Sequence, residues 1–332
     1  MKAMIIDGYG QVPMRLENMP TPEIGDDEVL AEIHAASINP IDFKIRDGQV
    51  KLLVKYNMPL ILGNDFSGVV AKVGAKVTRF KVGDEIYGRP RKSKIGTFAE
   101  YIAIHEDDIA FKPKNISFEE AASIPLVGLT AYQALTDILQ LQKEQKIFIQ
   151  AGAGGVGTFA IQLAKLMGAT VATTASKAGA NLVTSLGADK IIDYKSEKFE
   201  EILKNYDAVF DTLGGETLEK SFKVLRSGGK IVSVSGLPNA RFGRENGFGF
   251  FKTLLFAIAS NKLTKLEKKH KVHYSFLFMK PSGEQLRIIA NYIEEGNIKP
   301  IIDRVYPFED AQKALEFAEL GRAKGKVIVK IR

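Results

Sequence analysis

Three glycines, Gly152, Gly154 and Gly157, have the spacing needed to bind the diphosphate of a dinucleotide. They follow an apolar stretch at residues 147–149. The next residues contain an apolar face with helical spacing, made of Val156, Ala160, Leu163, Ala164 and Met167. In such a strand, turn and helix, the first glycine permits a tight turn, the second lets the backbone approach the diphosphate and the third allows close helix packing. The residues expected to bind the diphosphate, unless this is a glycine-rich turn without a ligand, are Gly152, Gly154, Gly155, Val156 and Gly157.

The strand after this helix departs from the pattern for NAD. An acidic residue usually ends that strand, about 20 residues after the glycines, and hydrogen-bonds the ribose 2′-hydroxyl. Residues 145–188 contain no Asp or Glu, and the expected strand at residues 170–174 leads into Ser176 and Lys177. A hydroxyl and an ammonium both donate to an anion, so they suit a 2′-phosphate. The sequence therefore predicts NADP(H), with a solvated loop lysine as the alternative interpretation of Lys177.

Length and composition indicate a folded chain of two domains. The chain has 332 residues, which is longer than one typical domain. Its hydrophobic content of 45% is enough to build a sizeable core. Its 46 basic and 39 acidic residues give a net charge of +7, a mild excess that gives little support for nucleic-acid binding. The sequence contains no cysteine, which excludes disulfides and thiolate metal sites.

The N-terminus and the apolar runs give no sign of a targeting or membrane segment. Residues 1–8 begin a strand and do not resemble a signal peptide. The longest apolar run, residues 253–259, is far too short to span a bilayer. We therefore expect a cytoplasmic protein with small-molecule partners.

The order of expected elements separates a strand-rich part from an alternating part. Up to residue 122, short strands separated by Gly or Pro predict a β-barrel-like domain, with strands at residues 28–35, 65–73, 85–87 and 97–104. From residue 123, strands alternate with helices such as the one at 216–225, which indicates a doubly wound parallel sheet with strands at residues 146–150, 170–174, 190–193, 207–211 and 230–235.

The last part of the chain is expected to return to the first domain. Its expected elements are a helix at residues 282–295, a strand at 301–306, a helix at 309–320 and a strand at 327–331. The predicted division is an α/β chain with residues 1–122 and 273–332 in one domain and residues 123–272 in the nucleotide-binding domain.

Seven sequence blocks, in this order and spacing, resemble the medium-chain dehydrogenase/reductase superfamily, specifically its zinc-independent quinone oxidoreductase type. The blocks lie at residues 37–42, 63–70, 82–84, 96–101, 128–131, 152–157 and 185–189. The resemblance covers essentially the whole chain. It implies a GroES-like catalytic domain, a Rossmann domain, a homodimer, and hydride transfer from NADPH to a quinone or to the activated C=C of an α,β-unsaturated carbonyl.

Departures from the zinc-dependent members of that superfamily argue against a metal. Asn39 stands where the first cysteine ligand falls, and Asn64 and Asp65 replace a His-Glu pair. The four-cysteine structural-zinc lobe is missing, and the chain has four histidines. We therefore expect no zinc and no metal-dependent alcohol oxidation.

Without a Lewis acid, direct hydride transfer suits acceptors that are electrophilic by themselves, such as quinones and conjugated enones. The resemblance implies that Asn39 donates a hydrogen bond near the reacting centre. Lys44 and Tyr56 are further candidates for the donor or general acid, with ordinary surface residues as an equal alternative. A non-catalytic NADPH-binding redox sensor is the alternative function.

Other cofactor contacts follow from the resemblance and from the positions of strand ends. The resemblance implies that Thr130 approaches the nicotinamide and that Tyr194 lies near the 2′-phosphate, unless Tyr194 is a half-buried aromatic. Strand ends collect ligand contacts in open α/β sheets. The remaining expected contacts, of which the last two have a solvated basic tail as their alternative, are Leu213, Ser235, Gly236, Phe276, Phe278, Arg322 and Lys326.

Residues 237–273 fit the superfamily pattern poorly. They contain six apolar residues, Phe248, Phe250, Phe251, Leu254, Leu255 and Phe256, followed by a basic run at residues 262–271. This segment could cap the substrate site, pack at a subunit interface or lie on a membrane surface. The position of the segment favours the cap or the interface, so no membrane contact is expected.

Overall fold

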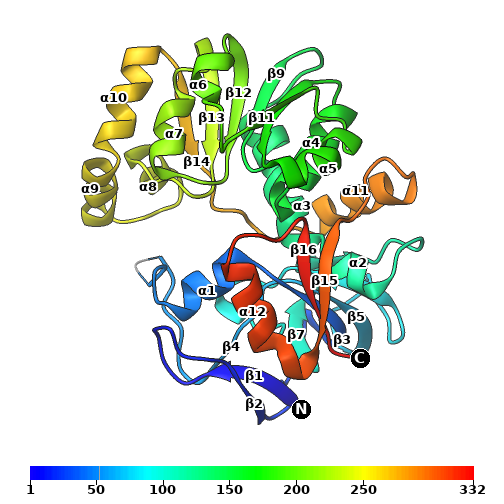
Figure 1. Cartoon of the computed structure of the whole chain (residues 1–332). Helices are drawn as coiled ribbons and strands as arrows, with labels where there is room; N and C mark the ends of the chain where they lie inside the picture. Colours follow the sequence, from blue (N-terminus) through cyan, green and yellow to red (C-terminus); the bar gives the residue numbers. More distant parts are fainter. Residues whose placement is uncertain (52) are drawn as a thin grey trace. The chain divides into compact units, whose positions relative to one another are not determined.

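The computed structural model describes residues 1–51 and 53–332 and divides the chain into two compact units. The first contains Met1–Leu129 and Lys280–Arg332, and the second contains Thr130–Met279. The strand-rich and alternating parts expected from the sequence fall into different units (Figure 1). Each unit boundary lies a few residues beyond residues 122 and 272.

The first unit holds two sheets and the helices that pack on them. A seven-stranded sheet runs in the order β15-β16-β3-β5-β6-β8, with β7 also paired to β3, and a three-stranded sheet runs β2-β1-β4. The strands are β1 (Lys2–Ile6), β2 (Arg15–Asn18), β3 (Glu28–Ile38), β4 (Leu60–Ile61), β5 (Phe66–Val73), β6 (Glu85–Gly88), β7 (Tyr101–His105), β8 (Ile109–Phe111), β15 (Ile302–Pro307) and β16 (Lys326–Lys330). The helices that begin in this unit are α1 (Pro40–Arg46), α2 (Phe118–Ala122), α3 (Pro125–Tyr132), α11 (Gly283–Glu294) and α12 (Ala311–Glu319).

Strand β3 organises this unit because it contributes to two hydrophobic cores. Val29, Ala31 and Ile33 alternate into one core, as expected for a strand with one buried face. Further along, Ala36 and Ile38 join a second core under α12. Strand β16 pairs antiparallel with β3, with Val327 opposite Ile38. The C-terminal strand therefore lies beside the start of α1, where the candidate site residue Asn39 is found.

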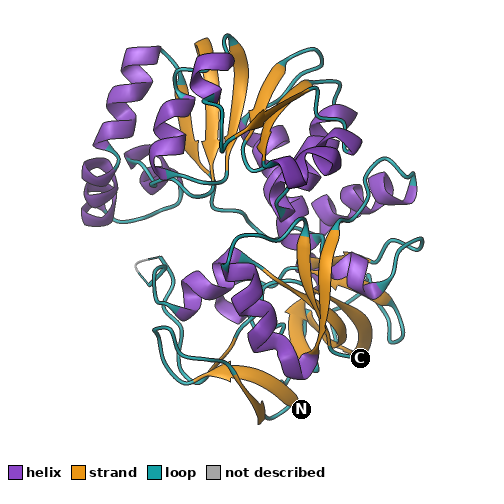
Figure 2. Cartoon of the chain, viewed as in Figure 1, coloured by secondary structure: helices purple, strands orange, loops and turns teal. Residues whose placement is uncertain are grey.

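The second unit is a six-stranded parallel sheet in the order β11-β10-β9-β12-β13-β14, with helices on its faces (Figure 2). Its strands are β9 (Lys146–Ile149), β10 (Thr170–Ala175), β11 (Lys190–Asp193), β12 (Tyr206–Asp211), β13 (Leu225–Ser233) and β14 (His273–Phe276). Its helices are α4 (Gly155–Leu166), α5 (Lys177–Ser185), α6 (Phe199–Ile202), α7 (Gly215–Ser221), α8 (Ala240–Glu245), α9 (Phe250–Ala259) and α10 (Asn261–His270). The strand order reverses between β9 and β12, which is where ligands bind in doubly wound sheets.

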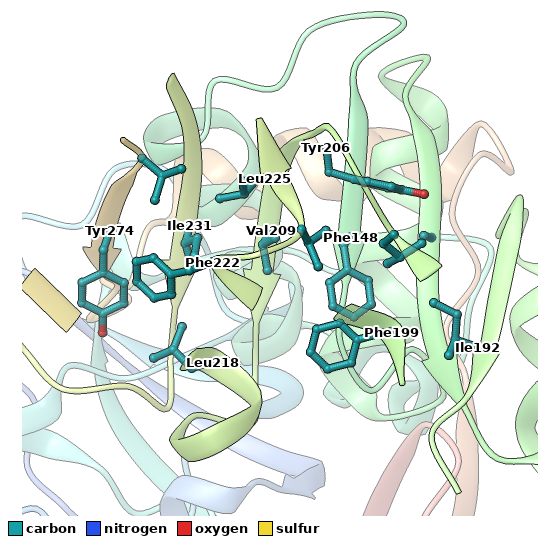
Figure 3. Packing of buried hydrophobic residues seen from close by; sticks show 14 of the residues in the cluster. Phe148, Ile192, Phe199, Tyr206, Val209, Leu218, Phe222, Leu225, Ile231 and Tyr274 are labelled. Atoms are coloured by element: carbon teal, nitrogen blue, oxygen red, sulfur yellow. The ribbon is translucent and has the colours of Figure 1, made fainter. Parts of the chain in front are cut away.

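Hydrophobic packing fixes this sheet. Phe148 on β9 is fully buried, and its ring lies 4.8 Å from the ring of Phe199, measured between centroids (Figure 3). The same cluster contains Phe222 after α7 and Tyr274 on β14, so it extends across several strands. Ile147 and Ile149, the neighbours of Phe148 on β9, are also fully buried. Successive side chains of a strand point to opposite faces, so the burial of all three shows that β9 is covered on both faces. This explains why its sequence is a continuous apolar run.

The structure differs from the sequence prediction in residues 237–279. The segment before residue 273 forms three helices, α8, α9 and α10. Residues 273–276, assigned from sequence to the returning domain, form β14 and pair in parallel with β13. Among the described residues, no helix is long and apolar enough to cross a membrane.

Candidate functional site

The glycine loop after β9 has the geometry of a phosphate-binding turn. A Cβ on Gly157 would lie 2.3 Å from the carbonyl oxygen of Ala151, and a Cβ on Gly152 would lie 2.2 Å from Oγ1 of Thr173. Both positions therefore require glycine. A Cβ on Gly154 would meet nothing closer than 3.4 Å, so space remains beside that residue. The first backbone bond of α4 is made by Thr158 to the Gly154 carbonyl, which leaves the amides of the first turn without helical acceptors.

Residues 155 and 156 contribute to the same turn. Gly155 and Val156 begin α4, and Gly154 is its N-cap with extended backbone. Val156 is half-buried rather than sealed in the core. Amides at a helix N-terminus carry partial positive charge and favour an anion. The residues therefore fit a dinucleotide diphosphate.

Hydrogen bonds join this loop to the loops after β12 and β13. The Thr212 hydroxyl donates to the Gln150 carbonyl at 3.3 Å, and the Ser235 hydroxyl donates to the Thr212 carbonyl at 2.9 Å. Asp211, fully buried at the end of β12, accepts the amide of Gly214 at 3.0 Å. Three strand-end loops are thus held together where the strand order reverses.

Asp211 is a positioning residue that the sequence analysis missed. Its carboxylate also accepts the amide of Leu213 at 3.2 Å and the hydroxyl of Ser233. The Ser233 hydroxyl in turn accepts the amide of Gly236 at 2.7 Å. Burial raises the pKa of Asp211, and these donors oppose the rise. The sequence signal that could have identified Asp211 is an acid at the last residue of a predicted parallel strand. Through these hydrogen bonds, the predicted contacts Leu213, Ser235 and Gly236 lie on loops that are bonded to each other.

The residues expected at a 2′-phosphate lie at the ends of two neighbouring strands. β10 and β11 are parallel, with Ala175 opposite Asp193. Ser176 and Lys177 follow the first strand and Tyr194 follows the second, so all three lie at one edge of the sheet. Ser176 is the N-cap of α5 and makes no side-chain cap bond, while the Tyr194 side chain is 60% exposed.

Two acids, Asp193 and Glu197, lie at this edge outside the acid-free stretch of sequence. Asp193 Oδ1 accepts the amide of Lys195 at 3.1 Å and Glu197 Oε2 accepts the amide of Asp193 at 2.9 Å, so both are engaged in the turn that follows β11. Strand β10, which follows α4, is still followed by the hydroxyl of Ser176 and the ammonium of Lys177.

Phe276 and Phe278 use their side chains for packing. Both rings contact Phe242 of α8, at centroid distances of 5.2 and 6.2 Å. The amide of Leu277, between them, donates to the Ser233 carbonyl at 2.9 Å. A contact from this segment to a carboxamide would therefore have to come from the other backbone groups of residues 276–278. Thr130, expected beside the nicotinamide, is buried on α3.

A second set of candidate residues forms a buried polar cluster in the first unit. Asn39 is fully buried, and its amide nitrogen donates to Asp65 Oδ2 at 2.9 Å and to the Ser37 carbonyl at 3.2 Å. Its oxygen accepts Lys326 Nζ at 2.5 Å. Both ends of the Asn39 side chain are therefore used within the protein. This corrects the expectation that Asn39 donates to a substrate and makes it a positioning residue.

Lys326 is also placed differently from the sequence prediction. Its side chain is buried, and Nζ donates to the Ile38 carbonyl at 2.8 Å and lies 3.7 Å from Asp65 Oδ2. Burial lowers the pKa of Lys326, and the Asp65 carboxylate opposes that fall. An ammonium with these partners does not fit the expected contact with a cofactor phosphate. Arg322, the other predicted phosphate partner, is exposed in the loop before β16.

The cluster continues through Asp42 to Arg89. Asp42 accepts the backbone amide of Asn39 and the side-chain amide of Asn64, each at 2.7 Å. Burial raises the pKa of Asp42 to about 7, although both hydrogen bonds oppose the rise. Arg89, 4% exposed, lies 3.5 Å from Asn64 Oδ1 and its Nε is buried without a described partner. Arg89 was not identified from the sequence.

This cluster does not fit a zinc ion. The positions that correspond to metal ligands hold two asparagines and one aspartate, and an ammonium takes the Asn39 oxygen and approaches Asp65. Zinc in proteins prefers thiolate, imidazole and carboxylate ligands. In the part of the chain that the structure describes, no group of three His, Cys, Asp or Glu residues could share a metal.

Tyr56 lines a cavity of about 1040 Å³ in the first unit, together with Lys92 and Lys280. The Tyr56 amide donates to the Tyr9 hydroxyl at 2.7 Å, which fixes the backbone there. Burial raises the pKa of Tyr56 to about 12, so its phenol remains a hydrogen-bond donor at neutral pH. The pKa of Lys92 falls to about 7, first through burial and then through the charges of Arg89 and Lys280.

Lys92 is a second functional candidate that sequence reasoning missed, although residues 89–94 contain four basic side chains. Lys44, the remaining predicted donor, is half-buried on α1, and burial lowers its pKa. It does not line the cavity that Tyr56 and Lys92 share. The structure thus brings together Tyr56 and Lys92, and leaves Lys44 apart from them.

Comparison with protein families matches two parts of the chain. The alcohol dehydrogenase GroES-like domain matches residues 25–114, and the zinc-binding dehydrogenase family matches residues 186–329. The first match lies in the unit with the buried cluster. The second includes the strand ends at Tyr194, Leu213 and Ser235.

Individual relatives match the whole chain. The 2-methylene-furan-3-one reductase of Solanum lycopersicum is 38% identical, over 99% of this chain and 79% of its own length. The chloroplastic NADPH-dependent alkenal/one oxidoreductase of Arabidopsis thaliana is 37% identical, with the same coverage. The crystal structure of the Escherichia coli quinone oxidoreductase complexed with NADPH is similar with a TM-score of 0.84 and 27% identity, and each chain is fully covered.

Proposed function

The chain belongs to the medium-chain dehydrogenase/reductase superfamily, and we propose on that basis that it is an NADPH-dependent reductase of conjugated enones and quinones. The names of two relatives describe reductases of α,β-unsaturated carbonyl compounds, which favours enones or enals as the first substrates to examine. The homodimer and the absence of zinc implied by the resemblance are part of this proposal.

The observation that carries the proposal is the Lys326 ammonium in the buried cluster. A metal-dependent alcohol dehydrogenase polarises the substrate oxygen with Zn²⁺. In this chain, the corresponding acceptors already bind a lysine, so the donor set does not suit that chemistry. An acceptor with its own electrophilic carbon needs no such metal.

NADPH would be held by the glycine loop, with the diphosphate on the first turn of α4 and the 2′-phosphate at Ser176, Lys177 and Tyr194. Bound there, it supplies a hydride to an electrophilic carbon. Leu213, Ser235 and Gly236 would border its remaining half on the bonded loops, with Thr130 and residues 276–278 at the nicotinamide. Asp211 holds the loops in place.

Tyr56 and Lys92 are the candidates for the substrate's oxygen and for the proton. Hydride addition to the β-carbon of an enone moves an electron pair to the carbonyl oxygen, where negative charge develops. The Tyr56 phenol can donate a hydrogen bond to that oxygen and stabilise the charge. The Lys92 ammonium can then give a proton to the α-carbon of the enolate, which completes the reduction of the double bond, because its pKa is close to neutral pH.

Cofactor oxidation by the purified chain tests the proposal. The assay follows NADPH consumption with a panel of quinones, enones and enals, with NADH in parallel and with zinc or a chelator as further arms. We expect turnover with NADPH on at least one acceptor class and no dependence on zinc. Tight NADPH binding without turnover on any acceptor would support the redox-sensor alternative instead.

A further inference from the structure

Helix α9 packs on the second unit through a narrow side only. The half-buried residues Thr253, Phe256 and Ala257 form its inner side, and no residue of the helix is fully buried. Phe256 contacts Phe242 and Phe248 at centroid distances of 6.0 and 5.3 Å. The helix is therefore anchored by one aromatic contact surface and leaves the rest of its circumference open.

The outer side of α9 is apolar. Phe250 and Phe251 are 77% and 80% exposed, and the other members of this face, between 45% and 66% exposed, are Leu254, Leu255 and Ile258. Spacings of one, three and four residues place all five on one face of the helix. A surface helix normally turns polar residues outward, so this arrangement is inverted. Exposed apolar faces of this kind mark interaction surfaces.

The segment that carries this face also carries most of the excess charge of the protein. Residues 240–272 contain eight Lys or Arg residues and two Glu residues, a net charge of +6, whereas the whole chain has +7. Glu267 is engaged by the backbone amide of Tyr274 at 2.7 Å and by Arg241 at 3.7 Å. The other acid of the segment, Glu245, is exposed to solvent.

The lysines of α10 are available to a partner. Lys262 pairs with Glu219 at 2.6 Å. The exposed lysines of α10 and of its C-cap that form no ion pair with any described residue are Lys265, Lys268, Lys269 and Lys271. They follow directly after the apolar face of α9, and both helices lie beside β14 at one end of the sheet (Figure 1).

We propose that α9 and α10 form a docking surface for an anionic lipid bilayer. Ten helical residues span about 15 Å, about half of the hydrocarbon thickness, so α9 would lie in the plane of the interface with its apolar face among the acyl chains. The four lysines would contact lipid phosphates. The sequence pattern favoured a cap or subunit contact for this segment, and the outward apolar face with adjacent unpaired lysines is the new observation.

Charge favours a bilayer over a second copy of the chain as the occupant of this surface. A two-fold contact places the same patch on both subunits, so two segments of +6 would face each other. Like charges in contact oppose association, whereas an anionic surface attracts them. The docking does not depend on the reductase activity proposed above.

Vesicle flotation of the full chain tests this proposal. The two vesicle types are phosphatidylcholine alone and phosphatidylcholine with about 30% phosphatidylglycerol. We expect the partition coefficient to rise about tenfold with the anionic lipid at about 50 mM salt, and to fall again at about 500 mM salt, where screening is strong. No association with anionic vesicles at low salt would overturn the proposal.

Two variants and a matched control assign the binding to this surface. F250S/F251S/L255S and K265E/K268E/K269E should each lose vesicle binding with an unchanged melting temperature. The control V82S/L320S removes two apolar side chains, 61% and 63% exposed, from the other unit and should bind as the parent does. If the control loses binding equally, or if the α9 variant changes only the oligomeric state in sedimentation, the surface is not a membrane site.

Discussion

The glycine loop of the second unit and the buried cluster of the first unit use polar groups in opposite ways. In the loop, the amides at the start of α4 have no helical acceptor, and Gly154 has open space beside it. In the cluster, Asn39, Asp42 and Lys326 make their bonds to other protein groups. The loop is prepared to receive an external anion, whereas the cluster already contains its own cation. The difference explains why one region is expected to bind a ligand and the other to hold structure.

Removing the cation of the cluster should have the largest effect. Lys326→Met leaves the buried Asp65 carboxylate without its ammonium partner, so the free energy of unfolding should fall by about 3–5 kcal/mol. Chemical denaturation measures this. Lys330→Met on the same strand removes an ion pair with Glu119 whose lysine is 54% exposed, and should cost less than about 1 kcal/mol. Equal losses in the two variants would show that the cluster is not a special site.

A side chain at Gly157 should strongly weaken NADPH binding and should have little effect on the stability of the buried cluster. In Gly157→Val, the new Cβ would overlap the Ala151 carbonyl, so either the loop or α4 must shift. A shift of this kind should weaken NADPH affinity about 100-fold or more. Gly8→Val is the matched variant, because a Cβ at Gly8 would meet nothing within 4 Å and Gly8 lies in the other unit. Fluorescence titration with NADPH would contradict this account if both variants bound equally.

The cavity next to the cluster should determine the pH dependence of the reaction. If Lys92 supplies the proton, kcat/KM for an enone should fall as pH rises through about 7, where the ammonium is lost. Lys92→Met should lower kcat by about 100-fold at pH 6 and remove this limb of the profile. Lys44→Met is the control, since Lys44 does not line the cavity. A profile that keeps its limb in Lys92→Met would exclude Lys92 as the proton donor.

Substitutions of Ser176 and Lys177 should have the smallest effect of the four, and this effect should be on the preference for NADPH over NADH. The double variant S176A/K177A removes the hydroxyl and ammonium expected at the 2′-phosphate, so the ratio of NADPH to NADH affinity should fall about tenfold. Affinity for NADH should stay nearly constant. Equal affinities of the parent chain for the two cofactors would refute the assignment from the start.

Local sequence pattern was sufficient for the first strands and the glycine loop of the second unit. Ile147, Phe148 and Ile149 are a continuous apolar run, which is typical of a buried parallel strand, and Gly152 and Gly157 occupy positions where a Cβ would collide with the chain. The apolar run and the spacing of the glycines are both visible in one short stretch of sequence. The strands at residues 170–174 and 190–193 were therefore predicted close to their observed bounds.

Long-range pairing decided what the pattern could not. Strand β14 begins at residue 273 because β13 offers it a parallel partner, and no local signal distinguishes this from a return to the other unit. The sequence showed the apolar residues of α9 but did not indicate which side of the helix packs on the protein. Which side of it packs depends on Phe242 and Phe248, which lie in other turns of the chain.

The sequence by itself indicated the superfamily, through the order of seven short blocks, and the glycine loop, because each of these patterns consists of adjacent residues. Only the tertiary structure decided that Lys326, 287 residues from Asn39, supplies the charge inside the cluster. It also decided that Asp211 bonds the loop after β12 and Ser233 at the end of β13, and that Lys92 shares a cavity with Tyr56. The physical reason is that burial and pairing across strands set the charge and contacts of a side chain, and these depend on residues distant in sequence.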